Sequence, residues 1–232
     1  MQVVITGASR GIGKAIAEIF AANGHHLHLT SRSEVALYKA VEELMTKYPF
    51  VTIKAKPFDL AKKAEAIACG NWVLLNGVPG VLVNNAGLFE PGSVNNEPDG
   101  LLESQMATNL YSAYHLTRTV LPAMMKQSSG HIFNMCSIAS LHAYQNGGAY
   151  SVSKFALYGF SKNLREEMKP HGIKVTAIHP GAVLTGSWGD YDNTSKRIME
   201  ASDIARIVYA TSQLSPQACV EDIVIRPQLG DL

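Results

Sequence analysis

The chain has 232 residues, a length at which α/β folds commonly form one domain with an ample buried core. Hydrophobic residues make up 47% of the sequence and charged residues 17%, a composition that excludes a disordered or fibrous chain. The 20 basic and 19 acidic residues are nearly balanced and scattered, which argues against nucleic acid as a partner, and we expect one domain over residues 1–232.

Short β-rich runs alternate with longer runs of helical period from end to end. The expected strands are Val3–Thr6, His26–Thr30, Val51–Lys56, Gly80–Val83, His131–Met135, Lys174–His179 and Asp222–Ile225. The expected helices include Ile12–Ala22, Val35–Lys47, Leu101–Lys126, Ala149–Met168 and one that begins near Ser202. Repeated strand and helix units imply right-handed crossovers. The expected fold class is α/β, a doubly wound Rossmann fold whose central parallel sheet has about seven strands and is flanked by helices on both faces.

Two segments break this alternation. Leu88–Gly100 is rich in glycine, proline and asparagine, and Gly181–Thr194 contains Trp188 and Tyr191. Both follow expected strands, and loops after parallel strands lie at the carboxyl edge of the sheet, where ligands bind. These loops are therefore the candidate walls of a substrate pocket.

A glycine-rich turn lies between the first strand and the first helix. Its glycines permit a tight turn and a close approach of the backbone to a pyrophosphate, whose charge the helix N-terminus would meet. The alternative is a strand-to-helix turn that needs glycine for its own geometry. The candidate cofactor-binding residues of this turn are Gly7, Ser9, Arg10, Gly11, Ile12 and Gly13.

The order and spacing of several motifs resemble the classical short-chain dehydrogenase/reductase family over the whole chain. The motifs are Thr6–Gly13, Asp59, Asn84–Gly87, Asn109, Ser137, Tyr150 with Lys154, and Pro180–Gly181 with Thr185. The resemblance implies an oxidoreductase that interconverts a small carbonyl compound and an alcohol by hydride transfer. It also implies a catalytic group formed by Asn109, Ser137, Tyr150 and Lys154.

The resemblance implies a role for each member of this group. Tyr150 would be the general acid/base, and Lys154, on the same helix face, would favour ionisation of that phenol and hold the nicotinamide ribose. Ser137 would hydrogen-bond the reacting oxygen, and Asn109 would interrupt its helix to hold a water that links Lys154 to solvent. Alternatively, Ser137 caps a loop and Asn109 is a buried amide that satisfies backbone groups.

A second Y-x-x-x-K pair, Tyr158 and Lys162, follows on the same expected helix. Eight residues displace a side chain by roughly 12 Å along a helix, so the two pairs cannot serve one site. Tyr150 stands thirteen residues after Ser137 and matches the family arrangement. We therefore expect Tyr158 to be a packing or interface residue.

The end of the second strand favours NADP over NAD as the cofactor. An NAD site usually has an acidic residue roughly 20 positions beyond the glycines, whereas this chain has Arg32 there. Arg32, together with Arg10, would hold a 2′-phosphate through charge-assisted hydrogen bonds. The alternatives are that both arginines are solvated, or that nearby Glu34 supports NAD.

Further cofactor contacts are implied by the resemblance, in addition to those of the catalytic pair. Asp59 would meet the adenine amino group, and Thr185 would hold the nicotinamide carboxamide. Alternatively, Asp59 caps the next helix and Thr185 is an ordinary turn residue. The implied contacts after the third, fourth and sixth strands are Asp59, Asn85, Ala86, Gly87, Pro180, Gly181, Val183 and Thr185.

The substrate is the least defined ligand. Aromatic and amphipathic residues in the candidate pocket favour a compact, partly apolar carbonyl compound. The C-terminal run Val224–Pro227 with Gly230 and Asp231 is similar to that of bacterial sepiapterin-reductase-like members, but the match is too brief to indicate a substrate. The candidate substrate residues are Phe89, His142, Tyr144, Trp188 and Tyr191.

Neither a metal nor export is expected. His26 and His28 share a strand face, but no carboxylate or cysteine has ligand spacing near them. Cys69, Cys136 and Cys219 are far apart and form no CxxC pair, which favours a reducing cytoplasm. The expected strand at the N-terminus leaves no room for a cleavable signal, and no apolar run approaches the ~20 residues of a membrane span.

Relatives dimerise through the helices that correspond to Leu101–Lys126 and Ala149–Met168, so a homodimer or homotetramer is expected. Two other functions stay open. A 3-oxoacyl carrier-protein reductase would need a basic docking surface, to which Lys162, Arg165 and Lys169 could contribute, although neighbouring glutamates favour an ordinary solvated face. A non-catalytic NADP-sensing binding protein is the second, and the intact catalytic group speaks against it.

Overall fold

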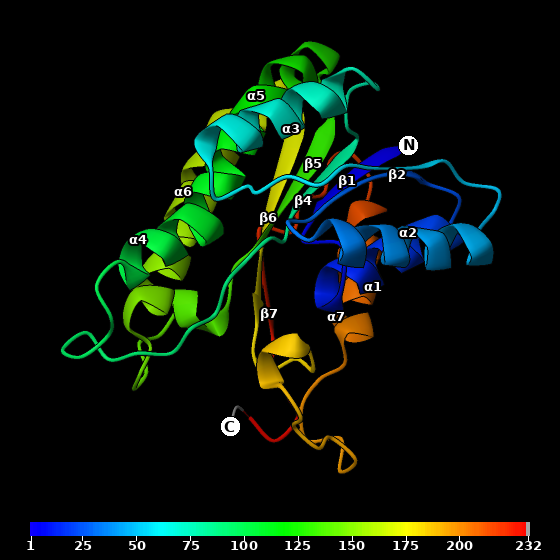
Figure 1. Ribbon diagram of the computed structural model, residues 1–232. Coiled ribbons are helices and arrows are strands. Elements are labelled where there is room, and N and C mark those ends of the chain that lie inside the picture. Colours follow the sequence, from blue (N-terminus) through cyan, green and yellow to red (C-terminus); the bar gives the residue numbers. More distant parts are fainter. Residues whose placement is uncertain (231–232) are drawn as a thin grey trace.

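A parallel sheet of seven strands in the order β3-β2-β1-β4-β5-β6-β7 forms the centre of the molecule (Figure 1). The computed structural model describes residues 1–230, so Asp231 of the C-terminal run lies outside the described residues. The strands are β1 (Gln2–Thr6), β2 (His26–Thr30), β3 (Ile53–Ala55), β4 (Val81–Asn84), β5 (Gly130–Met135), β6 (Ile173–Pro180) and β7 (Asp222–Ile225). The predicted Rossmann fold is confirmed.

Helices cover both faces of this sheet. In Figure 1, α1, α2 and α7 lie on one side of the sheet, and α3, α5 and α6 lie on the other. The helices are α1 (Gly11–Ala22), α2 (Glu34–Lys47), α3 (Lys63–Leu74), α4 (Leu101–Met106), α5 (Ser112–Gln127), α6 (Gly148–Met168) and α7 (Ala201–Ser212). Shorter turns are the π-helical η1 (Ala107–Tyr111) and the 3₁₀ turns η2 (Ile138–Ser140), η3 (Lys169–His171) and η4 (Gly186–Trp188). Within residues 1–230, no helix has the length and apolar character needed to cross a bilayer.

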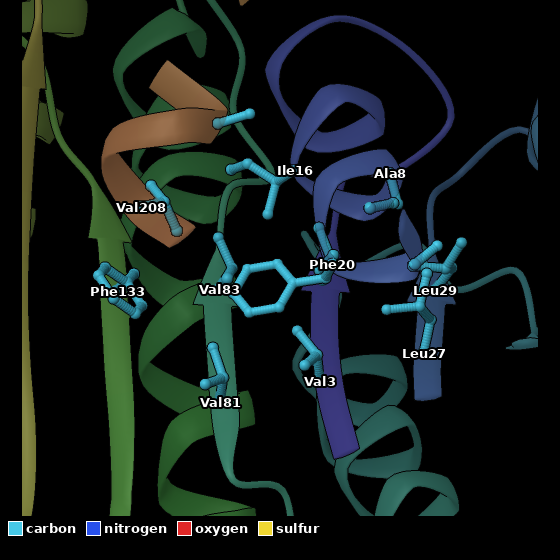
Figure 2. Close-up of a cluster of buried hydrophobic side chains, with 14 of the residues drawn as sticks. Val3, Ala8, Ile16, Phe20, Leu27, Leu29, Val81, Val83, Phe133 and Val208 are labelled. Atoms are coloured by element: carbon cyan, nitrogen blue, oxygen red, sulfur yellow. The ribbon is translucent and has the colours of Figure 1, made fainter. Parts of the chain in front are cut away.

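The side-chain alternation of the central strands supplies a hydrophobic core to each face. Val3 of β1 belongs to the core under α1, α2 and α7, whereas its neighbour Val4 belongs to the core under α3, α5 and α6. Figure 2 shows the first core, with the ring of Phe20 from α1 lying against Val3 and Val83. Because both faces are covered, β4 is buried along its whole length, which explains its apolar run Val81–Val83.

Two expected boundaries differ from the structure. The strand expected over Val51–Lys56 is shorter, Ile53–Ala55, because β3 is an edge strand that pairs only with β2. The helix expected over Leu101–Lys126 is divided into α4, η1 and α5. The π-helical turn contains Asn109, so the helix is interrupted at the residue for which an interruption was expected.

The strand order places the ends of β1 and β4 at the centre of the ligand-binding edge. β1 pairs with β2 on one side and with β4 on the other, so the chain changes its direction across the sheet between them. In doubly wound folds the crevice at such a switch point binds the cofactor. The two irregular loops extend beyond the same edge, below the sheet in Figure 1.

Candidate active site

The turn between β1 and α1 adopts the conformation that its glycines were expected to allow. Gly7 has φ +64° and Gly11 has φ +55°, both in the left-handed region. A β-carbon at position 13 would lie 2.3 Å from the carbonyl oxygen of Gly7, so Gly13 is required by close packing. The first turn of α1 can therefore approach the end of β1 closely.

The N-terminus of α1 fits an anionic ligand. Its N-cap residue, Arg10, has extended backbone and makes no side-chain capping hydrogen bond, and the first turn contains no acidic residue. The first N–H groups of a helix have no intrahelical acceptor and carry the positive end of the helix dipole. Gly11, Ile12 and Gly13 supply these groups, so the turn suits the pyrophosphate of a dinucleotide.

Thr6 and Asn85 join the glycine turn to the segment after β4. The Thr6 hydroxyl accepts hydrogen bonds from the N–H groups of Asn85 at 2.9 Å and Ala86 at 2.8 Å. The Asn85 amide donates in return to the carbonyl oxygens of Thr6 at 2.9 Å and Gly7 at 3.3 Å. Asn85 thus supports the turn. Thr6 belongs to the motif Thr6–Gly13, but the sequence analysis did not include it among the candidate cofactor-binding residues.

The two arginines expected to select the cofactor have different surroundings. Arg10 is exposed, and its guanidinium lies against the loop after β6, where a β-carbon at Gly186 would be 3.1 Å from Nη1. Arg32 is also exposed and follows β2 directly after buried Ser31. The Thr185 side chain approaches the glycine turn, because a β-carbon at Gly11 would lie 3.3 Å from its methyl group.

Asp59 lies in the turn between β3 and α3. Its carboxylate accepts a hydrogen bond from the Ala61 N–H at 3.4 Å and forms an ion pair with Lys62 at 3.5 Å. Its own N–H donates to the carboxylate of Glu65 at 2.7 Å. The N-cap of α3 is Lys62, so Asp59 is not the helix cap that was one alternative for it.

Three hydrogen bonds hold the side-chain amide of Asn109. Its Nδ2 donates to the carbonyl oxygen of Leu88 at 3.0 Å and to the Ser153 hydroxyl at 2.8 Å, and its Oδ1 accepts from the Leu88 N–H at 2.7 Å. Asn109 is 1% exposed, so these partners replace water. The residue therefore connects η1 both to the loop after β4 and to α6.

Lys154 of α6 is a buried cation. Its Nζ donates a hydrogen bond to the carbonyl oxygen of Met135 at 2.8 Å and lies 5.7 Å from the centre of the Tyr150 ring. A β-carbon at Gly87 would be 3.6 Å from the same Nζ, so Gly87 leaves space beside the amine. Burial lowers the pKa of Lys154 to about 8, because the charged form loses hydration.

The pKa of Tyr150 differs in direction from the sequence-based expectation. Burial raises it above its ordinary value, and a hydrogen bond with the Ser137 hydroxyl offsets only part of this effect. Lys154 was expected to favour the phenolate, but its ammonium is directed to the backbone of Met135. Tyr150 is therefore a neutral phenol in this structure, poised to donate a proton.

Ser137 is held by the short turn that it begins. Its hydroxyl accepts a hydrogen bond from the Ala139 N–H at 3.2 Å, and its own N–H donates to the Ser140 hydroxyl at 3.0 Å. The capping alternative for Ser137 agrees with these two hydrogen bonds, and the Tyr150 hydroxyl lies near the Ser137 side chain. Ser140, three residues later, was missed although its spacing is that of a capping box.

The candidate substrate residues form two aromatic groups. The Phe89 ring meets the Tyr150 ring edge to face at a centroid separation of 4.8 Å. Trp188 and Tyr191 contact each other at 5.3 Å in the loop after β6. Burial, and then the nearby Tyr150 hydroxyl, raise the pKa of Tyr144 to about 12. His142 is exposed on the η2–α6 loop.

The loop after β4 is fastened to the N-terminus of α6. The carboxylate of Glu97 accepts a hydrogen bond from the Ala149 N–H at 3.0 Å, one residue before Tyr150. The Gly92 N–H donates to the carbonyl oxygen of Asn146 at 3.1 Å, and the Ser93 hydroxyl bonds the Asn146 side chain at 2.6 Å. These contacts hold a wall of the candidate pocket against the helix that carries Tyr150.

The second Y-x-x-x-K pair lies away from this group. The Tyr158 ring packs edge to face on His179 at 4.7 Å, and Lys162 forms an ion pair with Asp222 at 2.8 Å. The expectation that Tyr158 is a packing residue agrees with these contacts.

Comparison with known proteins identifies close relatives in sequence and in fold. The family model described as short chain dehydrogenase matches residues 1–196. Sepiapterin reductase from Chlorobaculum tepidum is 33% identical, with 99% of this chain and 97% of that protein covered. An alcohol dehydrogenase from the archaeon Thermococcus sibiricus, solved with 5-hydroxy-NADP, superposes with a TM-score of 0.91 at 26% identity, covering 98% of this chain and 96% of its own. L-sorbose reductase from Gluconobacter frateurii, solved with NADPH and L-sorbose, has a TM-score of 0.88 at 26% identity, covering 97% and 94%.

Proposed function

The chain belongs to the short-chain dehydrogenase family, as its sequence motifs indicated, and we propose that it is an NADP(H)-dependent oxidoreductase that interconverts a small carbonyl compound and its alcohol. The observation that carries the proposal is the half-buried Tyr150 ring, which lies beside Ser137 and 5.7 Å from the buried amine of Lys154. Residues 1–232 would supply both cofactor binding and catalysis as one domain.

NADP(H) is the cofactor best supported. The alcohol dehydrogenase and the L-sorbose reductase were each solved with an NADP-type cofactor. In this chain the pyrophosphate would lie at the N-terminus of α1, and Arg10 and Arg32 would hold the 2′-phosphate. When bound, the nicotinamide supplies or accepts the hydride. Lys154 would hold its ribose, and Val183 and Thr185 would hold its carboxamide.

The catalytic group would transfer the proton that the reaction requires. In the direction of reduction, Tyr150 would donate its phenolic proton to the carbonyl oxygen of the substrate, while Ser137 hydrogen-bonds the same oxygen. Because burial disfavours a lasting phenolate, the Tyr150 proton has to be replaced promptly. Lys154, whose lowered pKa eases its loss of a proton, would act in that replacement, with Asn109 positioning the surrounding segments.

The substrate would be compact and partly apolar. Phe89 forms an apolar wall directly on the Tyr150 ring, and Trp188 with Tyr191 forms a second aromatic group. The Tyr144 hydroxyl, close to that of Tyr150, would offer a polar contact. His142 would complete the pocket from the exposed loop before α6.

The contacts of the candidate docking surface disfavour the carrier-protein alternative. Lys162 is paired with Asp222, Arg165 with Glu221, and Lys169 with Glu166. An acidic partner would have to compete with these ion pairs for the same cations. A small carbonyl compound therefore remains the preferred substrate class.

The proposal is tested by NADPH oxidation at 340 nm with a panel of ketones, aldehydes and diketones. We expect wild type to turn over at least one of them and Tyr150→Phe to lose turnover while retaining NADPH binding. Tyr209→Phe is the matched control, because Tyr209 packs on Phe20 of α1, away from the candidate site. Tight NADPH binding with no turnover in either direction would favour the sensing protein instead.

Assembly and location belong to the same proposal. We expect a homodimer or homotetramer formed through the α4–α5 region and α6, and light scattering at micromolar concentration would contradict this if it found only a 25.1 kDa species. A cytoplasmic location would suit the cysteines, all three of which are free thiols.

A further inference from the structure

His179 connects the end of β6 to the proposed catalytic serine. It is the last residue before Pro180, and its side chain is fully buried (0% exposed). The ring Nδ1 lies 3.2 Å from the carbonyl oxygen of Ser137, and the ring Nε2 lies 3.3 Å from Oδ1 of Asp222. One imidazole therefore spans the distance between Asp222 of β7 and Ser137, the second residue after β5.

The partners of His179 define its hydrogens. A carbonyl oxygen and an ionised carboxylate can only accept hydrogen bonds. The contact of Nδ1 with the Ser137 carbonyl is therefore a hydrogen bond only when Nδ1 carries the hydrogen.

The carboxylate is itself held in its ionised form from α6. Lys162 donates to Oδ2 of Asp222 at 2.8 Å, and the Tyr158 hydroxyl lies near the same carboxylate. Burial would raise the pKa of Asp222, but the hydrogen bonds from Lys162, His179 and Tyr158 outweigh it, so the pKa is lowered. The titratable groups that face the imidazole are thus Asp222 from β7 and Tyr158 from α6, with Lys162 behind the carboxylate.

We propose that His179 is a positioning residue that fixes the backbone of Ser137 through an Nδ1–H hydrogen bond, and that Asp222, Tyr158 and Lys162 form its support. The second Y-x-x-x-K pair then has a structural purpose different from that of the first. The inference rests on the proposed function, in which the Ser137 hydroxyl bonds the reacting oxygen.

The position of this contact explains why it would matter for turnover. The Ser137 carbonyl already accepts a hydrogen bond from the Ser140 N–H at 2.9 Å, which holds it from the following turn. His179 adds a second donor from the neighbouring strand, so the carbonyl is held from two sides. Rotation of this peptide would move the Ser137 hydroxyl away from Tyr150, and small displacements of a catalytic group are costly.

Two substitutions separate the halves of the link. His179→Asn places an amide N–H where Nδ1 stands and can keep the Ser137 contact, whereas His179→Gln places its amide near Nε2 and can keep only the Asp222 contact. His131→Gln is the matched control, because His131 is buried in β5 of the same sheet and bonds Thr176 at 2.7 Å, at the end of the strand opposite Ser137.

We expect His179→Gln to lower kcat about tenfold with little change in the KM for NADPH, and His179→Asn to restore most of that loss. His131→Gln should lose comparable thermal stability and keep the wild-type kcat. Equal losses in the Asn and Gln variants, or an equal loss of kcat in His131→Gln, would overturn the positioning role. Should His179→Gln fail to fold, Asp222→Asn takes its place, with a lower kcat expected.

Nuclear magnetic resonance of the full chain separates this inference from the proposed function. In ¹⁵N-histidine-labelled protein, Nδ1 of His179 should have the shift of a nitrogen that carries hydrogen. The backbone ¹⁵N shift of Ile138, which follows the Ser137 carbonyl, should change in His179→Gln and recover in His179→Asn. An Nδ1 of His179 that carries no hydrogen in wild type would refute the link even if the enzyme is active. The predicted shifts with no turnover of any carbonyl would refute the function alone.

Discussion

The Nδ2 of Asn109 and the hydroxyl oxygen of Ser153 lie 2.8 Å apart, so the π-helical turn η1 is hydrogen-bonded directly to the helix that carries Tyr150 and Lys154. The Ser153 hydroxyl in turn donates to the carbonyl oxygen of Tyr150 at 2.7 Å. Because the π turn changes the helical register at this point, it presents the Asn109 amide to α6 and to the loop after β4 together.

Asn109→Ala should therefore damage both stability and turnover. The substitution leaves the Leu88 N–H and carbonyl groups without their partner, so we expect a loss of about 2 to 4 kcal/mol in the free energy of unfolding and a fall of about tenfold or more in kcat. Urea unfolding and NADPH oxidation measure the two effects. Asn134→Ala removes another buried amide, bonded to Ser161, and should lose stability without losing kcat. Equal losses of kcat in Asn109→Ala and Asn134→Ala would show that Asn109 has only a general structural role.

Lys154→Met should stabilise the cofactor-free protein at pH 7. The pKa of buried Lys154 is lowered from 10.5 to about 8, so between these values the unfolded chain binds more protons and stability rises with pH. Below about pH 8 both states are protonated and the folded state bears the full cost of the buried charge, roughly 3 kcal/mol. The lost hydrogen bond to Met135 offsets about 1 kcal/mol, so a net gain of about 2 kcal/mol is expected for the variant.

Urea unfolding at pH 7 and at pH 9.5 checks the sign of this effect. The advantage of Lys154→Met over wild type should shrink at the higher pH, because the folded wild-type amine is then mostly neutral. Lys39→Met, at an exposed position of α2, should show no such pH dependence. An advantage that grows with pH, or no advantage at pH 7, would mean that the Lys154 amine is not desolvated in the folded protein.

Glu97→Ala should loosen the N-terminus of α6. The N-cap of this helix, Gly147, makes no side-chain capping bond, and Glu97 supplies the missing acceptor to Ala149 from the loop after β4. We expect a loss of about 1 kcal/mol in the free energy of unfolding and a fall of about threefold in kcat. Glu97→Gln should keep most of both, because an amide oxygen can still accept, and Glu90→Ala should change neither, since its side chain is exposed in the same loop. An unaltered kcat in Glu97→Ala would show that the loop does not position Tyr150.

Sequence reasoning succeeded where a pattern is local and failed where a contact joins distant segments. The glycine turn, the strand and helix alternation and the Tyr150–Lys154 spacing each lie within a few residues, and the structure has them as expected. The contact of Glu97 with Ala149 spans 52 residues, and that of His179 with Ser137 spans 42, so no local spacing reveals them. The direction of the Tyr150 pKa was also missed, because burial is a property of the folded site rather than of the helix face.

The choice of cofactor should depend on Arg32 and Arg10 together. If both guanidiniums bind the 2′-phosphate, each single alanine substitution should raise the Kd for NADPH about 10- to 100-fold and leave the Kd for NADH unchanged, because only NADPH carries that phosphate. Arg10 lies against Gly186, so its contribution includes leaving that contact and should be the smaller of the two. Fluorescence titration measures the Kd values for NADH and NADPH and hence their ratio, with Arg206→Ala on the exposed surface of α7 as the control.

If the two arginines share one phosphate, the double variant should lose less binding free energy for NADPH than the two single variants lose together, since the effects of neighbouring groups are not additive. Parallel weakening of NADH and NADPH would instead assign these arginines to the parts that both nucleotides have in common.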